Sequence, residues 1–287
     1  MKRITVLSGK GGVGKSSITA SLAVTLSQTH KIVCVDCDVD ASNLALIFGL
    51  RDKNYDSWTP LSTNQKAHFD LQKCNSCGLC FKTCYFDAID FKNKKPKLKE
   101  FSCEGCGACE LVCPNNAINL VEEFNAKIGY AKTKYGFSVV SAQLGIGESG
   151  SGKVVAAVKE LGNKLSDKKE IMLIDAAAGI GCPVIASVTG SDYVIAITEP
   201  TPSGFSDLKR ALKMVNHFKI PKSVIINKYD INLDFSKKIE KYLIENNLKL
   251  TSKIKYDKSF SDALMNLVPV IEQNEEFLNV FQKIYVD

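Results

Sequence analysis

Short apolar runs alternate with longer segments of helical spacing over most of the chain. The runs expected to be strands cover residues 3–7, 31–36, 137–142, 171–174, 193–198 and 223–227. Helical spacing occurs in residues 16–28, 44–48, 152–165, 183–190, 204–218 and 235–247. Strands separated by helices are typical of βαβ units, in which parallel strands are covered by helices on both faces. The pattern therefore predicts an α/β fold with a doubly wound, mostly parallel sheet.

Two stretches interrupt this alternation. Residues 51–69 are polar and contain Trp58-Thr59-Pro60, so they are expected to form a linker. A cysteine-rich segment follows and ends near residue 120. We therefore predict one domain formed by residues 1–65 and 125–287, with a second, smaller domain inserted at residues 66–124.

Composition and charge narrow the class of protein. Of 287 residues, 37 are Lys or Arg and 31 are Asp or Glu, a formal charge of +6 spread along the chain. Nucleic-acid binding usually needs a concentrated basic face, so none is expected. No apolar run reaches 18 residues, and the N-terminus turns glycine-rich too early for a signal peptide. We expect a cytoplasmic protein that binds neither nucleic acid nor membrane.

The cysteines are concentrated in the insert. Eight of the eleven lie between Cys74 and Cys113. Without a signal for an oxidising compartment, such clustering indicates metal binding rather than disulfides. The spacing C-x2-C-x2-C-x3-C occurs twice and predicts a small α+β domain of the bacterial ferredoxin type, with two [4Fe–4S] clusters.

In this ferredoxin pattern each fourth cysteine binds the cluster of the other repeat. The first cluster would be held by Cys74, Cys77, Cys80 and Cys113. The second would be held by Cys103, Cys106, Cys109 and Cys84. A structural zinc site is the alternative, but such sites typically use two separated C-x2-C pairs.

A phosphate-binding loop follows the first predicted strand. Residues 9–16 fit G-x-x-x-x-G-K-[ST] and lie between a strand and a helix, which is the context that the motif requires. Lys15 should reach the β- and γ-phosphates of a nucleotide, and the Ser16 hydroxyl should bind Mg²⁺. The loop residues expected to surround the phosphates are Gly9, Gly11, Gly12, Val13, Gly14 and Ser17. The alternative is a glycine-rich turn that binds nothing.

Lys10 makes the match more specific. With a second lysine early in the loop, Lys10-Gly-Gly-Val-Gly-Lys15-Ser16 resembles the deviant Walker A loop of the MinD/ParA/Mrp and nitrogenase iron protein superfamily. The resemblance implies a nucleotide-sandwich dimer, formed by two copies or with a paralogue, in which Lys10 reaches the partner's phosphates. It also implies that Asp38 positions the attacking water while Asp36 supports Mg²⁺.

The same resemblance extends to later strands. Asp175 and Gly179 look like the Walker B aspartate and switch II, where they would hold Mg²⁺ through water and approach the γ-phosphate. Asn227 and Lys228 end a later strand, where this superfamily contacts the base. Their N-K-x-D pattern also occurs in guanine-reading GTPases, but the rest of the chain resembles ATPases, so ATP is the expected nucleotide.

Three cysteines lie outside the insert. Cys34 and Cys37 fall on a predicted strand, where side chains three apart point to opposite faces, so we expect both to be core residues. Cys182 follows switch II, where the nitrogenase iron protein holds its dimer-bridging cluster. The main expectation is that Cys182 is a small buried residue. One alternative is that it is a ligand at the dimer interface, and another is that it has a redox role or contacts substrate.

Over its whole length the chain resembles MinD-superfamily ATPases that carry an inserted ferredoxin domain. Three function classes compete. The first is ATP-dependent electron transfer through two [4Fe–4S] clusters to a redox partner, favoured by the full set of eight cysteine ligands. The second is assembly or carriage of iron–sulfur or other metallocofactors, as in Mrp-type proteins. The third is a ParA-like organiser whose clusters sense redox state.

Overall fold

The computed structural model describes residues 1–148, 150–165 and 167–284, and the chain divides into two compact units. The first unit comprises Met1–Thr59, Ile128–Gln143 and Gly150–Asp287. The second comprises Pro60–Lys127 and Leu144–Ser149. The predicted insert, residues 66–124, lies within the second unit.

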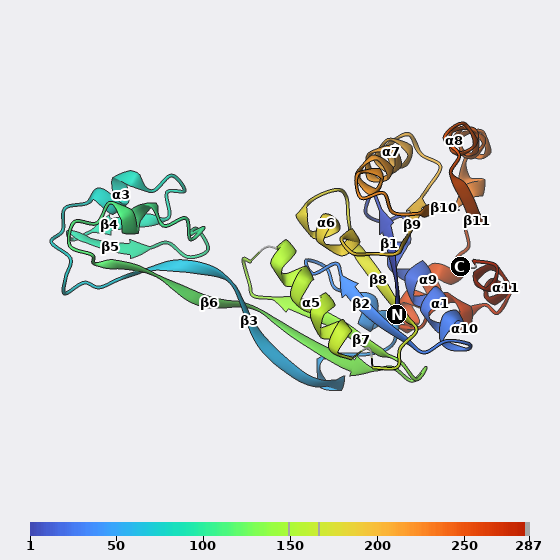
Figure 1. Ribbon diagram of the computed structural model, residues 1–287, viewed down its shortest axis with the longest axis horizontal. Helices are drawn as coiled ribbons and strands as arrows, with labels where there is room; N and C mark the ends of the chain where they lie inside the picture. The colour runs from blue at the N-terminus through green and yellow to red at the C-terminus, as the bar shows by residue number, and fades with distance from the viewer. Residues whose placement is uncertain (149, 166, 285–287) are drawn as a thin grey trace. The chain divides into compact units, whose positions relative to one another are not determined.

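The main sheet has nine strands in the order β11-β10-β9-β1-β8-β2-β7-β6-β3 (Figure 1). The strands are β1 Lys2–Ser8, β2 Ile32–Cys37, β3 Tyr55–Phe69, β6 Ile118–Lys132, β7 Ser138–Leu144, β8 Ile171–Ala178, β9 Tyr193–Thr198, β10 Lys222–Asn227 and β11 Lys249–Ile254. Pairing is parallel from β11 through β10, β9, β1, β8 and β2 to β7. The prediction of a mostly parallel α/β sheet is therefore confirmed.

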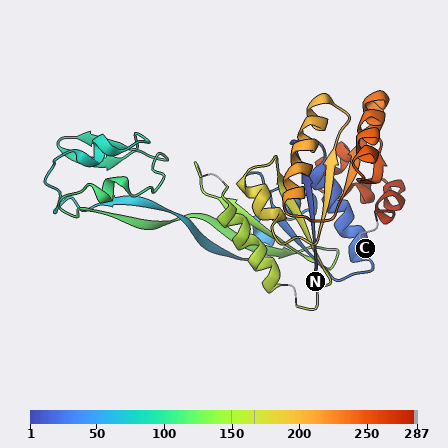
Figure 2. The same ribbon diagram turned by 45° about the horizontal axis from the view of Figure 1, so that its top comes forward.

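Helices cover both faces of this sheet in the first unit (Figure 2). They are α1 Lys15–Ser27, α2 Leu44–Ile47, α5 Gly152–Lys164, α6 Cys182–Val188, α7 Pro202–His217, α8 Leu233–Glu245, α9 Ser259–Asn266, α10 Val270–Gln273 and α11 Glu276–Gln282. None of the helices in the described part of the chain is long and apolar enough to cross a membrane.

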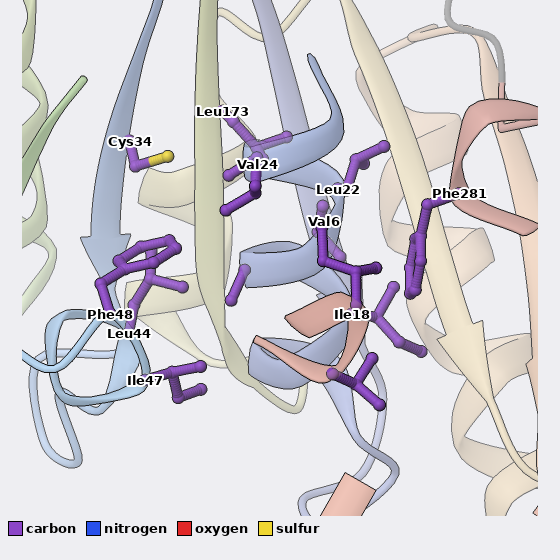
Figure 3. Packing of buried hydrophobic residues seen from close by; sticks show 14 of the residues in the cluster. Val6, Ile18, Leu22, Val24, Cys34, Leu44, Ile47, Phe48, Leu173 and Phe281 are labelled. Carbon is purple, nitrogen blue, oxygen red and sulfur yellow. The ribbon is translucent and has the colours of Figure 1, made fainter. Parts of the chain in front are cut away.

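Two apolar clusters fill the space between the sheet and its helices. On one face, Val6 of β1 packs with Ile18 and Leu22 of α1 and with Phe281 of α11 (Figure 3). The next residue of β1, Leu7, belongs to the other cluster, which includes residues of α6, α7 and α8. This alternation follows from strand geometry, because successive side chains point to opposite faces. The core thereby fixes α1, and with it the loop that precedes it.

The second unit contains a small cluster of its own. Strands β4 Ile89–Lys92 and β5 Lys95–Leu98 form an antiparallel hairpin. Helices α3 Leu79–Thr83 and α4 Ala108–Leu111 each follow a glycine in the left-handed conformation. Cys80 and Cys109 are buried with three apolar residues, so the cysteines form part of the packing here.

The prediction of a linker over residues 51–69 is wrong. Residues Asp52–Asn54 form a 3₁₀ turn, and Tyr55–Phe69 form the strand β3. Only one of its fifteen residues is buried, so hydrophobic alternation gave no signal. Pro60 lies within the strand, and β3 ends the strand order of the sheet. An edge strand tolerates proline because the missing N–H need not pair.

Candidate nucleotide site and cysteine cavities

The predicted phosphate-binding residues meet at the carboxyl edge of the parallel sheet. The loop of residues 9–14 follows β1, and α1 begins at Lys15. A cavity of about 520 Å³ lies beside it. Predicted residues that line this cavity are Gly11, Gly12, Gly14, Lys15, Ser16, Ser17 and Asp38. In open α/β sheets this edge is where ligands bind.

Residues that the sequence did not indicate complete the cavity wall. Leu46 and Ile47 come from α2, and Leu264 and Leu267 come from α9 and the residue after it. These apolar side chains line the same cavity as the polar loop, so the cavity offers surface for phosphates and for an apolar group. No local signal could have found Leu264 and Leu267, because more than 240 residues separate them from the loop.

Two glycines of the loop are required by close neighbours. A Cβ on Gly9 would lie 2.3 Å from the carbonyl oxygen of Asp207, and one on Gly14 would lie 2.5 Å from Asn227 Nδ2. Gly14 also has a φ of +91°, in the left-handed region. Both positions therefore exclude a side chain. Val13 between them is buried in the core, which anchors the loop.

Lys15 and Ser16 are both bonded to Asp175, at the predicted Walker B position in β8. The distance from Lys15 Nζ to Asp175 Oδ1 is 2.8 Å, and Ser16 Oγ donates to Asp175 Oδ2 at 2.6 Å. Thr19 Oγ1 donates to the same carboxylate at 2.9 Å, a partner that the motif did not predict. Burial alone would lower the pKa of Lys15, but the Asp175 carboxylate outweighs it and holds that pKa above its usual value.

Asp36 and Asp38 have different surroundings. Asp36 is fully buried and accepts hydrogen bonds from Ser42 Oγ at 2.7 Å and from Leu44 N at 3.0 Å. Burial, with Asp175 nearby, raises the pKa of Asp36 to about 7. Asp38 lines the cavity, and its Oδ2 lies 3.7 Å from Lys15 Nζ. Asp36 therefore shapes the loop that presents Asp38 to the cavity.

Asn227 and Lys228 bind the backbone of the phosphate loop. Asn227 Nδ2 donates to the Val13 carbonyl at 2.8 Å, and Lys228 Nζ donates to the Gly12 carbonyl at 3.3 Å. These two hydrogen bonds fix the backbone of the phosphate loop through its carbonyl groups. Contact with a base stays a prediction for both residues.

Glu199 was missed by the sequence analysis. It directly follows β9, and its carboxylate lies 3.0 Å from Lys10 Nζ and 3.2 Å from Lys228 Nζ. Burial would raise the pKa of Glu199, but hydrogen bonds from both lysines hold it below its usual value. Its only signal in the sequence is an acidic residue at the carboxyl end of a predicted strand.

Gly179 and Cys182 lie on the segment after β8. Gly179 N donates to the Ser8 carbonyl at 2.9 Å, which places the start of this segment beside the phosphate loop. Cys182 is the first residue of α6 and is exposed, so the main expectation of a buried residue is wrong. Cys34 and Cys37 are both buried in β2, as predicted.

The eight cysteines of the second unit line two cavities. One cavity is lined by Cys74, Cys77, Cys80 and Cys113, and the other by Cys84, Cys103, Cys106 and Cys109. Cys113 Sγ accepts a hydrogen bond from Ala117 N at 3.2 Å, and Cys84 Sγ accepts one from Ala88 N at 3.3 Å. The two repeats thus have matching backbone donors at their fourth cysteines.

Burial raises the pKa of Cys109 to about 11, with Cys103 and Cys106 contributing. The pKa of Cys80 is also raised, by burial and by the other cysteines of its cavity. Among the described residues, no group of three or more His, Cys, Asp or Glu is arranged to hold a single metal ion, so neither set of four cysteines forms a one-ion site such as that of zinc.

Comparison with known proteins defines the class. The profile of the CobQ/CobB/MinD/ParA nucleotide binding domain matches residues 4–270, so the chain belongs to this family of P-loop nucleotide-binding proteins. The chain is 35% identical over 286 residues to the uncharacterized protein MJ0578 of Methanocaldococcus jannaschii, a match covering 99% of this chain and 95% of that protein.

The chain is also similar to a solved structure in its fold, and to another protein in the sequence of a shorter segment. The structure of the septum site-determining protein MinD with Mg-ADP from Pyrococcus horikoshii superposes with a TM-score of 0.61 at 17% identity, covering 99% of this chain and 93% of MinD. The cytosolic Fe-S cluster assembly factor CFD1 of Yarrowia lipolytica is 46% identical over 73 residues, 24% of this chain and 25% of CFD1.

Proposed function

We propose that the chain is an ATPase that acts as a nucleotide-sandwich dimer and carries electrons through two [4Fe–4S] clusters to a partner protein. The observation that carries this proposal is the division of the eight cysteines. They line two cavities in the crossed sets that two [4Fe–4S] clusters require, in a chain that also has a phosphate loop beside a cavity.

In the first unit, Lys15 would bind the β- and γ-phosphates of ATP. Ser16 and Asp175 would hold Mg²⁺, because their oxygens lie together at 2.6 Å and such oxygens are the ligands that Mg²⁺ prefers. The ion would supply positive charge against the phosphates. Nucleotide binding must draw Lys15 away from Asp175, which frees this carboxylate for the ion or its water.

Asp38 is the proposed positioning group for the attacking water. It lines the cavity on the loop after β2, with Lys15 3.7 Å away. Lys10 of a partner copy would neutralise charge that develops on the transferred phosphoryl group. Hydrolysis would then wait for dimer formation, because each protomer's cavity receives this cation from the other chain.

In the second unit, each set of four cysteines would hold one cluster, and the clusters would supply one-electron transfer. The fit is supported by the separate cavities and by N–H donors that already point at Cys84 and Cys113. Hydrogen bonds to cysteine sulfur stabilise its negative charge and thereby raise the reduction potential of such a site.

The order of the chain supports coupling between the two activities. The loop that carries Asp38 follows β2 and is followed by α2 and then by β3, which enters the second unit at Pro60. A movement of the Asp38 loop on nucleotide binding could therefore be passed along the chain to β3, which leads to the first cysteine repeat.

Iron–sulfur cluster assembly is the second candidate function, favoured by the 46% identity to CFD1 over 73 residues. The two candidates differ in the fate of iron. Reconstituted protein should be mixed with an apo-ferredoxin and MgATP, and the iron in each protein should be measured after separation. A parallel mixture should contain dithionite-reduced protein, freed of excess dithionite, with MgATP and an oxidised holo-ferredoxin. Retention of iron in the first mixture together with reduction of the holo-ferredoxin in the second supports electron transfer, whereas net movement of iron to the apo-protein supports assembly.

A further inference from the structure

Glu199 bridges two lysines at the nucleotide site. It lies between β9 and α7, and its side chain is only 11% exposed. Oε1 lies 3.0 Å from Lys10 Nζ, and Oε2 lies 3.2 Å from Lys228 Nζ. Both carboxylate oxygens are therefore engaged by cations of the same chain.

This contact ties Lys10 to its own protomer. Lys228 Nζ also donates to the Gly12 carbonyl, so Glu199, Lys228 and the phosphate loop form one connected network. The Lys10 side chain is 37% exposed, which leaves it free to move toward solvent or toward another molecule. An ammonium paired with Glu199 does not also neutralise a phosphate of a second copy, so the carboxylate and the phosphate compete for Lys10.

The ion pair between Glu199 and Lys10 is weak enough for a triphosphate to displace it. A partly exposed ion pair contributes up to about fivefold in an equilibrium constant, and threefold is a reasonable central value. A triphosphate carries more negative charge than one carboxylate, so it can take Lys10 from Glu199. A small anion or an empty partner site offers less charge and leaves the pair intact.

We propose that Glu199 is an intramolecular counterion that holds Lys10 in the monomer and makes dimer formation depend on a triphosphate bound by a second copy of the chain. The proposal rests on the proposed function, since it assumes the nucleotide-sandwich dimer. Glu199 acts here through Lys10 and is a positioning residue.

The test is the dissociation constant of the dimer, measured by analytical ultracentrifugation with saturating Mg²⁺ and a non-hydrolysable ATP analogue. Glu199→Gln keeps the shape of the side chain and removes its charge. In each protomer the loss of this competing ion pair should favour dimer formation by about threefold in the equilibrium constant. Because the dimer contains two copies of Lys10, its dissociation constant should fall by about tenfold in total. Glu199→Ala should act in the same direction and serves if the amide variant does not fold.

Three further variants isolate the cause. Glu199→Asp keeps the charge and should stay within about twofold of the unmodified protein. Glu240→Gln removes a similar ion pair, 3.1 Å from Lys253 on α8 and β11, and should leave the constant unchanged. In a Lys10→Ala background Glu199→Gln should have no effect, because the residue that it releases is gone.

An unchanged or weaker dimer in Glu199→Gln would overturn the inference, as would equal tightening in the Lys10→Ala background. If the unmodified protein forms no analogue-dependent dimer, the proposed function fails and the inference fails with it. If the dimer forms and needs Lys10 but is indifferent to Glu199→Gln, only the role of Glu199 is wrong.

Discussion

Lys15 Nζ lies 2.8 Å from Asp175 Oδ1, so the lysine of the phosphate loop is bound to the carboxylate at the end of β8. The contact neutralises two buried charges that would otherwise be costly to hold away from water. Lys10, which is more exposed, is likewise paired with a carboxylate, that of Glu199. Under the proposed function, both lysines of the loop would exchange a carboxylate for a phosphate when nucleotide binds and the dimer forms.

The two lysines should give different defects when each is replaced by alanine. Lys15→Ala should lose ATP binding, because its ammonium faces the cavity from the first residue of α1. Lys10→Ala should still bind ATP but lose on the order of 10³-fold in turnover, the range for a positioned cation in phosphoryl transfer. Steady-state hydrolysis and nucleotide binding should be measured on the same preparations.

The control for these variants is Lys253→Ala, which removes a surface lysine paired with Glu240 and should leave turnover unchanged. Turnover in Lys10→Ala equal to that of the unmodified protein would remove the sandwich-dimer mechanism.

The iron content should follow the crossed cysteine sets. Anaerobically reconstituted protein should hold about eight iron atoms per chain, and Cys113→Ser should reduce this to about four, by loss of the cluster shared with Cys74, Cys77 and Cys80. Cys34→Ala, in the core of the first unit, should keep the full complement. Iron should be measured by metal analysis, with zinc determined in parallel. Stoichiometric zinc without iron would contradict the ferredoxin assignment of the second unit.

Cys182 should respond to nucleotide. Its thiol is exposed at the start of α6, so it should be alkylated in nucleotide-free protein, whereas Cys34 and Cys37 should not, because both are buried. If Cys182 faces the dimer partner, a non-hydrolysable ATP analogue should protect it, as read by peptide mass spectrometry. Equal labelling with and without the analogue would place Cys182 outside the dimer interface. Iron beyond the ferredoxin complement that is lost in Cys182→Ala would indicate a bridging cluster.

The contribution of Asp36 to the stability of nucleotide-free protein should fall as pH rises between about 4 and 7. Burial raises the pKa of Asp36 from 3.8 to about 7, so in this range the folded state holds a proton that the unfolded state releases. The contribution of Asp36 to the free energy of unfolding therefore decreases with pH, by at most about 1.4 kcal/mol per pH unit. Asp36→Asn should remove this contribution and shift the slope of unfolding free energy against pH upward.

Urea unfolding at several pH values in EDTA measures this slope, because EDTA removes Mg²⁺ that would bind the buried acids. Asp234→Asn provides the control, since it removes an exposed carboxylate on α8. An identical slope in Asp36→Asn and in the unmodified protein would show that Asp36 does not titrate in this range.

The sequence predicted the parts of the fold that depend on periodicity and spacing. The parallel strands and the phosphate loop carry local signals, because a buried strand is apolar and the loop needs its glycines. Strand β3 was missed because only one of its fifteen residues is buried and because it includes Pro60. Its place in the sheet depends on pairing partners that are distant in sequence.

The site residues that could be predicted from the sequence are those that belong to a motif of known chemistry. The loop residues Lys15 and Ser16 follow from their motif, but Glu199 and Thr19 belong to none. Their importance comes from Lys10 and Asp175, which tertiary structure brings within 3.0 Å and 2.9 Å of them. Cys182 was expected to be a buried small residue, and only its place at the start of α6 in the structure shows that it is exposed.

The most direct test of ATP-dependent electron transfer is a redox titration of the reconstituted protein, followed by electron paramagnetic resonance. It should be run with dithionite-reduced protein in the presence and absence of MgATP, and repeated with Lys15→Ala, which should not bind the nucleotide. We predict that MgATP changes the cluster signal or its midpoint potential in the unmodified protein and not in Lys15→Ala. Spectra and potentials that are the same with and without MgATP would contradict coupling between the two units.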